Sequence, residues 1–381
     1  MRLPAAREGE DVVVRHKRTP FSFWPTYHGT RREGLQWTLF ASDPWFLIES
    51  YLSNLEDEEV YNEAYAFLAQ ARDFYRAATD SDISAAKPLL LYYAFLNLGK
   101  CLATYRGAAS LGSNVKHGIS EKLPTTPGAI YGDANILRNQ DANSAFKKFS
   151  DALGDALPNA VAPATHVALR SQDFLAQILI GHRVWCSGEG IKERFISLQD
   201  VRYRHDPTTQ EMWVRVRMYK DDLSRFSYSQ TAAASALNIG GGGQFRTVIC
   251  DEAGEDDREL IEFEQIATEH YPNRPSESLQ QLSQKVRKSL WRSVTSYPPY
   301  RKYYIYIPTA AQTILSQLQS LYLSCYYFGS ITRYKPASFA TILDSDIGAF
   351  VQEFFTNQPS QILYLITSEF VEQEVTRAAI V

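Results

Sequence analysis

Residues 87–100 read KPLLLYYAFLNLGK, and this stretch predicts a buried helix at the centre of a helical core. Pro88 suits the first turn of a helix, because its missing N–H would have no intrahelical partner there. The residues that follow are mostly large and apolar, as in a core helix or a membrane span. The apolar run is too short to cross a bilayer, which needs about 20 residues. We therefore expect a core helix.

A polar stripe follows one side of this helix. Tyr93, Asn97, Lys100 and Thr104 recur at helical spacing and therefore share a face. Buried polar groups need hydrogen-bond partners, because an unpaired amide or ammonium is costly. Two interpretations remain open: the stripe pairs with a neighbouring helix or meets solvent, or it lines a pocket for a ligand or partner.

Composition places the chain among ordinary globular proteins. Of its 381 residues, 45% are hydrophobic and 22% charged, so a sizeable core can form. The net charge of −4 gives no overall attraction to nucleic acid or to acidic membranes. The N-terminus lacks an apolar signal core, and polar residues interrupt the apolar run 305–331, so we expect no membrane span. The cysteines are far apart without a CxxC pair, which gives no zinc signature and fits a reducing cytoplasm.

The hydrophobic pattern divides the chain into four segments. Residues 1–34 are polar and basic around an aromatic group, and we expect an arm. Residues 35–190 have helical spacing, and residues 309–381 return to it. Residues 191–308 favour strands, because the pattern alternates cleanly at 212–218 after a turn cluster, as in a hairpin.

The C-terminal segment contains a second long apolar pattern. It predicts a helix from Thr309 to about Arg333, which Pro336 ends. This helix has a polar stripe of its own: Gln312, Ser316, Ser320 and Ser324. We expect it to pack against the helix that begins at Pro88, so that the two stripes satisfy each other. The predicted fold class is α+β, mainly α-helical: a helical bundle from both chain ends around a β-rich inserted module at 191–308.

Two blocks of the sequence resemble the YaaC family of bacterial proteins. The first is KPLLLYY at 87–93 with Leu98, Lys100 and His117-Gly118, and the second is FGSITRYKP at 328–336. The second block continues in matching residues further on: Phe350, Glu353, Phe354 and the tail from Gln358-Pro359 to Ser368-Glu369-Phe370. The resemblance implies a largely helical cytoplasmic protein of bacteria, and it supplies no catalytic residues.

No motif identifies a reaction. None of the seven histidines lies in HExxH or within five residues of another, so no metal site is predicted. The Walker A and GxSxG motifs do not occur, and no cofactor is predicted. No histidine follows an arginine by four to six residues, which disfavours a HEPN-type ribonuclease. Gly240–Gly243 precedes a strand rather than a helix, which favours a flexible loop over a phosphate cradle.

Lys100 and His117 are the candidate catalytic residues. His117 lies in an irregular stretch, where a histidine serves as a general base or is simply a surface residue. The candidate binding residues are polar or cationic side chains of the helical patterns: Tyr93, Asn97, Lys285, Arg287, Lys288, Arg292, Arg333, Tyr334 and Lys335. The cationic stretch 285–292 either contacts phosphates or faces solvent or the acidic stretch 251–269.

Two functions remain open from the sequence. The first is a non-enzymatic scaffold or binding protein whose partner is another protein, a second copy of the chain or a nucleic acid. The alternative is an effector that acts on nucleic acid or nucleotides in bacterial conflict or defence. The sequence does not decide whether a reaction is catalysed. Convergence of Lys100, His117 and Arg333 on one pocket would favour an enzyme.

Overall fold

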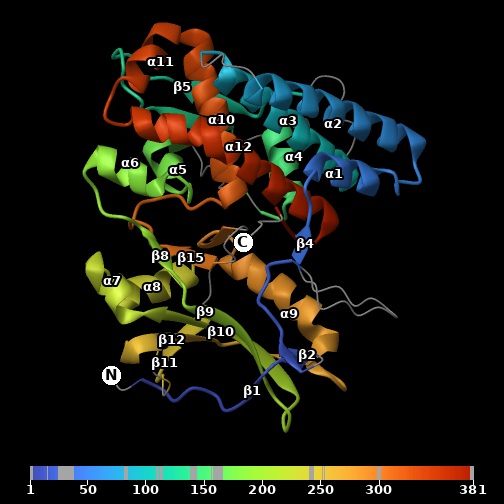
Figure 1. The fold of residues 1–381 in the computed structure, drawn as a ribbon, viewed down its shortest axis with the longest axis vertical. Coiled ribbons are helices and arrows are strands. Elements are labelled where there is room, and N and C mark those ends of the chain that lie inside the picture. Colours follow the sequence, from blue (N-terminus) through green and yellow to red (C-terminus); the bar gives the residue numbers. More distant parts are fainter. Residues whose placement is uncertain are drawn as a thin grey trace. The chain divides into compact units, whose positions relative to one another are not determined.

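The computed structural model forms two compact units (Figure 1). Unit 1 comprises Met1–Phe40, Lys192–Ala310 and Glu372–Val381, and unit 2 comprises Ala41–Ile191 and Ala311–Val371. The structure describes residues 3–14, 16–24, 38–80, 85–108, 111, 115–137, 144–155, 157, 166–239, 244–250, 252, 254–297 and 302–377. The predicted Gly240–Gly243 loop lies outside the described residues.

Unit 2 is built mainly from helices. Its described helices are α1 (Pro44–Leu52), α2 (Glu58–Thr79), α3 (Lys87–Tyr105), α4 (Ala145–Ala152), α5 (Ser171–Ala176), α6 (His182–Glu189), α10 (Gln317–Tyr334), α11 (Pro336–Leu343) and α12 (Gly348–Val371). A small antiparallel sheet joins them, in the order β5 (Ile119–Lys122), β6 (Asp133–Leu137), β7 (His166–Arg170).

Helix α3 is the central element of unit 2, as its sequence predicts. It packs against α2, α4, α10 and α12, and its apolar residues such as Leu91, Leu98 and Leu102 are fully buried. Gly99 lets α4 approach closely, because a Cβ there would lie 3.2 Å from Cδ2 of Phe149. Burying such side chains contributes about 1.5–3 kcal/mol each, so this contact surface is a main source of stability.

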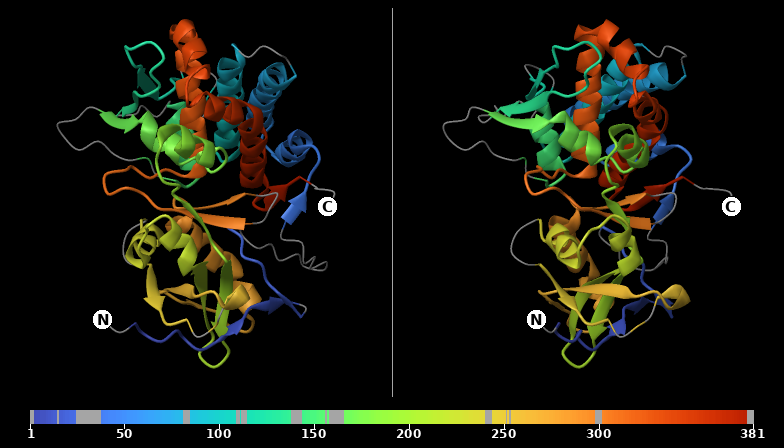
Figure 2. Two further views of the ribbon diagram at one scale, coloured as in Figure 1. Left: turned by 60° about the vertical axis from the view of Figure 1, so that its left-hand side comes forward. Right: turned by 90° about the vertical axis from the view of Figure 1, so that its left-hand side faces the viewer.

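The expected packing of α3 against α10 is confirmed. Figures 1 and 2 show the two helices side by side, and Gly329 of α10 faces α3 so closely that a Cβ would lie 3.2 Å from that of Tyr92. Helix α10 begins at Gln317 rather than near Thr309, because Ser316 and Gln319 form a capping box there. The helix therefore starts where its cap is, within the apolar run.

The two polar stripes are satisfied only in part and within their own helices, since the buried hydroxyls of Thr104 and Ser320 have no hydrogen-bond partner among the described residues. The Asn97 amide donates to the carbonyl of Tyr93 at 3.0 Å, and the Ser324 hydroxyl donates to the carbonyl of Ser320 at 2.7 Å. Each bond spans four residues, so it closes on the preceding helical turn. The predicted pairing of one stripe with the other is not found among these described bonds.

Unit 1 is rich in short strands and contains three described α-helices: α7 (Lys220–Arg225), α8 (Gln230–Leu237) and α9 (Pro275–Leu290). Its largest sheet runs β1 (Glu10–Asp11), β9 (Asp200–Asp206), β10 (Glu211–Tyr219), β12 (Leu260–Gln265), β11 (Phe245–Val248), and β13 (Glu269–His270) also pairs with β10. A second sheet runs β14 (Val294–Tyr297), β15 (Lys302–Tyr306), β8 (Phe195–Ser197). Unit 1 also contains two separate strand pairs: β2 (Val13–Val14) with β3 (Lys17–Arg18), and β4 (Thr38–Phe40) with β16 (Glu374–Thr376). The predicted hairpin is β9–β10.

A network of buried ion pairs crosses the large sheet. The Arg217 guanidinium donates to Glu262 at 2.5 Å, and both side chains are nearly inaccessible to solvent. Arg215 on the same strand pairs with Glu262 at 3.2 Å and with Glu264 at 3.4 Å. Because each of these charges is paired, the sheet face can be buried.

The predicted fold class is wrong. The protein has a mixed α+β fold, 48% helix and 21% strand with several small sheets, rather than a helical bundle with an inserted module. Both chain ends pair in unit 1, since β16 runs parallel to β4 and β1 pairs with β9. These strands have two or three residues, too few for a period-two pattern to appear in the sequence. Among the described residues, no helix is long and apolar enough to span a membrane.

Candidate functional site

A pocket in unit 2 lies where α3, β5 and the C-terminal half of α10 meet. Its volume is about 200 Å³, and its lining includes Tyr93, His117, Glu121 and Arg333. We call it the His117–Arg333 pocket. It is therefore built from both sequence blocks that contain the candidate residues.

Local structure fixes the position of His117. The following residue, Gly118, has φ of +77°, and a Cβ there would overlap the hydroxyl oxygen of Ser144. Only glycine adopts this left-handed conformation without strain, and only glycine leaves room for that contact. The turn therefore holds His117 at the start of β5, beside α3.

The imidazole of His117 is anchored by a buried tyrosine. Its Nδ1 lies 2.5 Å from the hydroxyl oxygen of Tyr92, and the tautomer decides which of the two groups donates. His117 keeps access to solvent, but partial burial of its ring lowers its pKa, the positive charges of Lys100 and Arg333 lower it further, and Glu121 opposes them. A histidine with a lowered pKa is neutral at pH 7.

Glu121 is held by a second tyrosine. The Tyr326 hydroxyl donates to the Glu121 carboxylate and also lies 3.2 Å from the carbonyl oxygen of Ile119. Burial and the neighbouring carboxylate raise the pKa of Tyr326 well above its ordinary range, so the phenol keeps its proton. The pocket thus combines a carboxylate and an imidazole, each oriented by a tyrosine.

Arg333 is the exposed cation of this pocket. Its guanidinium lies 4.9 Å from the ring centroid of Tyr334, a cation–π distance, and the Tyr334 side chain is 55% exposed. An arginine and an aromatic ring are therefore both presented to solvent at the end of α10.

The other candidates of the two helices have structural contacts. The Lys100 ammonium lies 5.1 Å from the Phe67 ring centroid, and burial lowers its pKa while Glu63 opposes this shift. Lys100 does not line the pocket but is close enough for its charge to act on His117. Asn97 is buried, and Lys335 donates to the carbonyl of Pro124. Of Lys100, His117 and Arg333, the structure brings the last two into one pocket.

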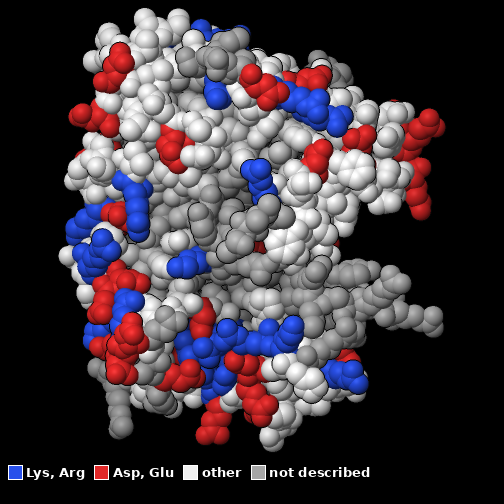
Figure 3. All heavy atoms as spheres, viewed as in Figure 1, with Lys and Arg blue, Asp and Glu red and all other residues white. Residues whose placement is uncertain are grey.

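The basic helix lies in unit 1 and corresponds to α9. Arg287 lies 4.4 Å from the Trp24 ring and 4.5 Å from the Trp291 ring, and Lys285 pairs with Glu269. Lys288 is exposed, and Arg292 is half-buried. On the face that Figure 3 presents, acidic and basic side chains are interspersed, so that face shows no broad basic field.

Sequence reasoning missed Tyr92, Glu121 and Tyr326. Tyr92 and Tyr326 lie in apolar helical runs, where tyrosine is an ordinary core residue. Glu121 lies in a stretch without helical periodicity that forms a short strand. Only the packing of α3 and β5 on α10 places these residues together. Among the described residues, no group of three His, Cys, Asp or Glu side chains could hold a metal ion.

Both blocks that form the pocket fall within one family match. A family model described as YaaC-like protein matches residues 34–370. The chain belongs to this family. The match includes every residue that lines the His117–Arg333 pocket, so the pocket lies within the YaaC-like region. Comparisons with curated proteins and with solved structures give no match.

Proposed function

We propose that the protein is a binding protein that captures a nucleotide-type ligand, with a phosphate and a planar base, in the His117–Arg333 pocket. The observation that carries the proposal is that Arg333, stacked on the exposed Tyr334, lines the same pocket as His117. A guanidinium matches the oxygens of a phosphate, and aromatic or guanidinium planes stack on bases. Arginine next to an exposed tyrosine therefore suits this pair of ligand groups.

The remaining polar groups of the pocket fit a base edge. The Glu121 carboxylate is an acceptor, and carboxylates accept from the amino groups of bases. The volume of about 200 Å³ is below the usual range of about 300–1,000 Å³ for small-molecule pockets. The pocket would hold the base, with the phosphate beside the exposed Arg333 and the rest of the ligand outside, as suits the end of a single strand.

Calorimetric titration at low salt tests this proposal, because phosphate contacts are strongest there. The ribonucleoside monophosphates, one at a time, and a short single-stranded RNA are the probes. Arg333→Gln should weaken binding about tenfold or more, as expected for the loss of a hydrogen bond to a charged group.

Arg225→Gln is the matched control. Arg225 is also exposed and also stacks on the next residue along the chain, Phe226, at 5.4 Å. The Arg225→Gln variant should bind the probes as tightly as the unaltered protein does. Failure of every probe to bind, or an equal loss in both variants, would contradict the proposal.

One observation favours a second function, cleavage of RNA by an effector. In the tautomer whose Nδ1–H donates to Tyr92, the Nε2 of His117 carries a free lone pair and can act as a general base. It would take the proton of a 2′-hydroxyl, whose oxygen bonds to phosphorus as the bond to the 5′-oxygen breaks. The leaving oxygen would take a proton from water, and Arg333 would stabilise the charge on phosphorus.

Incubation of the purified protein with single-stranded RNA tests this second function. Cleavage to 2′,3′-cyclic phosphate ends that is lost in His117→Asn, with RNA binding retained, would support it. If the protein binds RNA without any cleavage, only the binding function remains supported.

A further inference from the structure

The large sheet of unit 1 has one apolar face and one charged face. Side chains alternate along a strand, so the apolar residues of β10, such as Val214 and Val216, share one face. The buried arginines and glutamates of β10 and β12 share the opposite face with Trp213 and with Arg204, its cross-strand neighbour on β9. Residues 3–11, which we call the covering segment, run across this charged face and end in β1, as the blue trace from N shows in Figure 1.

The sheet binds the backbone of the covering segment. The carbonyl of Pro4 accepts from a backbone N–H next to β11 at 2.9 Å. The carbonyl of Arg7 accepts from the guanidinium of Arg215. The carbonyl of Gly9 accepts from the guanidinium of Arg204. Carbonyls two residues apart lie on the same side of an extended chain, so the charged face presents its donors at the spacing of an extended peptide.

The side chain of Arg7 is also recognised. Its guanidinium donates to the carbonyls of Gln265 at 2.7 Å and Ile266 at 2.6 Å. It also lies 5.6 Å from the ring centroid of Trp213, a cation–π distance. The backbone N–H of Arg7 donates to the Glu264 carboxylate at 2.9 Å. A planar guanidinium with several donors suits this set of contacts better than a lysine ammonium.

Gly9 is the second position at which the surface requires a particular residue. A Cβ at Gly9 would lie 2.6 Å from the carbonyl oxygen of His205 and 2.7 Å from the ring of Trp213. A backbone oxygen cannot move aside as a flexible side chain can, so glycine alone fits here. The side chain of Glu8, between the two positions, is exposed. The charged face therefore selects an arginine followed two residues later by a glycine.

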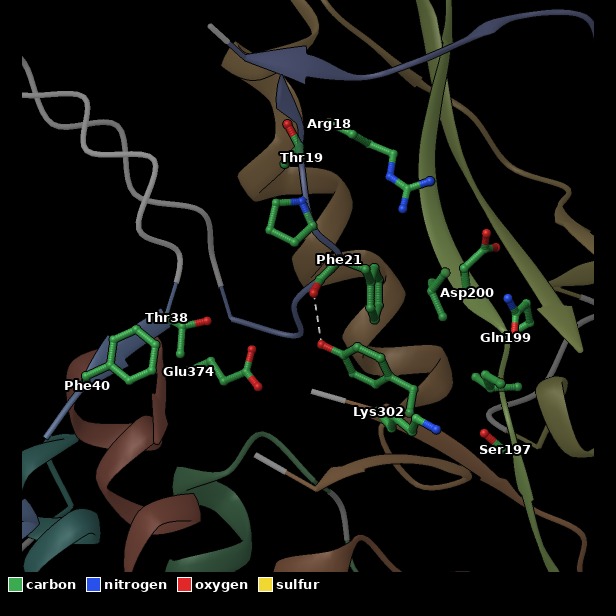
Figure 4. A pocket seen from close by; sticks show the side chains of 14 residues that line it. Arg18, Thr19, Phe21, Thr38, Phe40, Ser197, Gln199, Asp200, Lys302 and Glu374 are labelled. Carbon is green, nitrogen blue, oxygen red and sulfur yellow. Dashed lines mark hydrogen bonds between the residues drawn. The ribbon is translucent and has the colours of Figure 1, made fainter. Parts of the chain in front are cut away.

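The covering segment is held mainly by these polar contacts. Leu3 is 42% exposed, and every residue from Leu3 to Asp11 keeps some access to solvent. From Val12 onward the chain is anchored, because Val12 is 1% exposed and the carbonyl of Phe21 accepts from the Tyr303 hydroxyl at 2.9 Å, the dashed line in Figure 4. Segments with few buried apolar contacts open locally at a low free-energy cost. The covering segment can therefore leave while the chain after it stays in place.

The charged face does not need this cover for its stability. An apolar face must be shielded from water by other elements, whereas paired arginines and glutamates are also stable in water. Burying such charges costs desolvation energy, which their pairing only offsets. The cover is therefore explained better by recognition of a peptide than by a need for burial.

We propose that the charged face is a peptide-binding surface, which the covering segment occupies in the free protein and which takes in its place an extended segment of a partner protein with an arginine followed two residues later by a glycine. The covering segment shows the contacts that such a partner makes: carbonyls to Arg204 and Arg215, and a guanidinium to the end of β12. Its effective concentration is about millimolar, so it excludes dilute or weak partners. The proposal is independent of the His117–Arg333 pocket, because all of these residues belong to unit 1.

Release of the covering segment within the full chain tests the proposal. The double variant Arg7→Ala/Gly9→Ala weakens this segment and leaves the residues of the receiving face unaltered. The probe is a fluorescent peptide with the sequence of residues 3–11, and anisotropy measures its binding. The peptide should bind the double variant at least tenfold more tightly than the unaltered protein, in which the covering segment competes. Equal affinity for the two proteins, or no binding to either at millimolar concentration, would overturn the proposal.

Altered peptides test which residues are recognised. Arg7→Lys in the peptide keeps the charge but loses the guanidinium that donates to two carbonyls, and Gly9→Ala adds the Cβ that the face cannot accommodate. Each altered peptide should bind the double variant at least tenfold more weakly. The matched control is Glu8→Gln at the exposed position between them, which should bind like the natural peptide. An equal loss in all three peptides, or a loss in none, would contradict the proposed recognition.

A change on the receiving face completes the test. Arg204→Gln, added to the double variant, removes the donor to the Gly9 carbonyl and should weaken peptide binding about tenfold. Arg225→Gln, at an exposed arginine of α7 in the same unit, should leave binding unchanged. An equal effect of both changes would contradict the assignment of this face. Sedimentation that finds a dimer of the unaltered protein, dissociated by the peptide, would replace the separate partner by a second copy of the chain and overturn the proposal.

Discussion

Removing one or the other partner of the hydrogen bond between Tyr92 and His117 should lower the stability of the protein by different amounts. Tyr92 is 5% exposed, whereas His117 is exposed, and the oxygen and Nδ1 are 2.5 Å apart. Tyr92→Phe leaves an imidazole that water can reach, so it should cost only the net value of one hydrogen bond, about 0.5–1.5 kcal/mol. His117→Phe keeps a flat ring but leaves a buried hydroxyl unpaired, which costs about 1–3 kcal/mol.

The double variant should therefore recover stability. Adding Tyr92→Phe to His117→Phe removes the stranded hydroxyl, so the two effects should couple by about 1–2 kcal/mol. Urea unfolding of the four proteins in this cycle measures the coupling, and each kcal/mol should also lower the melting temperature by roughly 2–4 °C in a unit of this size. Additive effects within about 0.5 kcal/mol would show that the two side chains do not interact and would refute the anchoring of His117.

Three further predictions concern charge. Arg333→Gln should raise the pKa of His117, because the positive charge of Arg333 opposes protonation, and Glu121→Gln should lower this pKa further, because the Glu121 carboxylate favours protonation. NMR titration of the imidazole measures both pKa shifts. Shifts of the same sign in the two variants would contradict the assignment. Because the folded-state pKa of His117 is lowered, its contribution to stability is present above its ordinary pKa and is lost as the pH falls from that value through the lowered folded-state pKa. Arg217→Met should destabilise unit 1 by about 3 kcal/mol, because Glu262 would keep only its ion pair with Arg215. Adding Glu262→Gln to Arg217→Met should restore part of the lost stability. An unchanged urea midpoint in Arg217→Met would contradict this prediction.

Long apolar patterns allowed the sequence to predict the core of unit 2. The run at residues 87–100 is long enough for helical spacing to be unambiguous, and α3 spans Lys87–Tyr105. The packing partner α10 also followed from its apolar surface. The start of α10 did not, because the pattern alone does not distinguish an apolar extended segment from a helix before the cap at Ser316.

The arrangement of the chain ends could not be predicted in the same way. Strands β4 and β16 are three residues each and pair in parallel from opposite ends of the chain. Neither carries a local signal for its partner, because strand pairing at this sequence separation depends on the whole fold. The error in the fold class has this cause.

For a related reason, the sequence predicted only part of the candidate site. His117 and Arg333 were both selected from the sequence, but they are far apart along the chain and only α3, β5 and α10 bring them together. Their orienting partners Tyr92 and Tyr326 lie in apolar helices and resemble core residues. The roles of all these residues in binding or catalysis stay predictions until they are tested.

The most direct test of the central claim is the NMR signal of the His117 imidazole during a titration with a ribonucleoside monophosphate. If the phosphate binds beside Arg333 in the His117–Arg333 pocket, the added negative charge should raise the pKa of His117, because a nearby anion favours the imidazolium. The shift should saturate with the ligand and disappear in Arg333→Gln, but persist in Arg225→Gln. An imidazole signal and a pKa that stay unchanged at saturating ligand would contradict the claim that this pocket is the binding site.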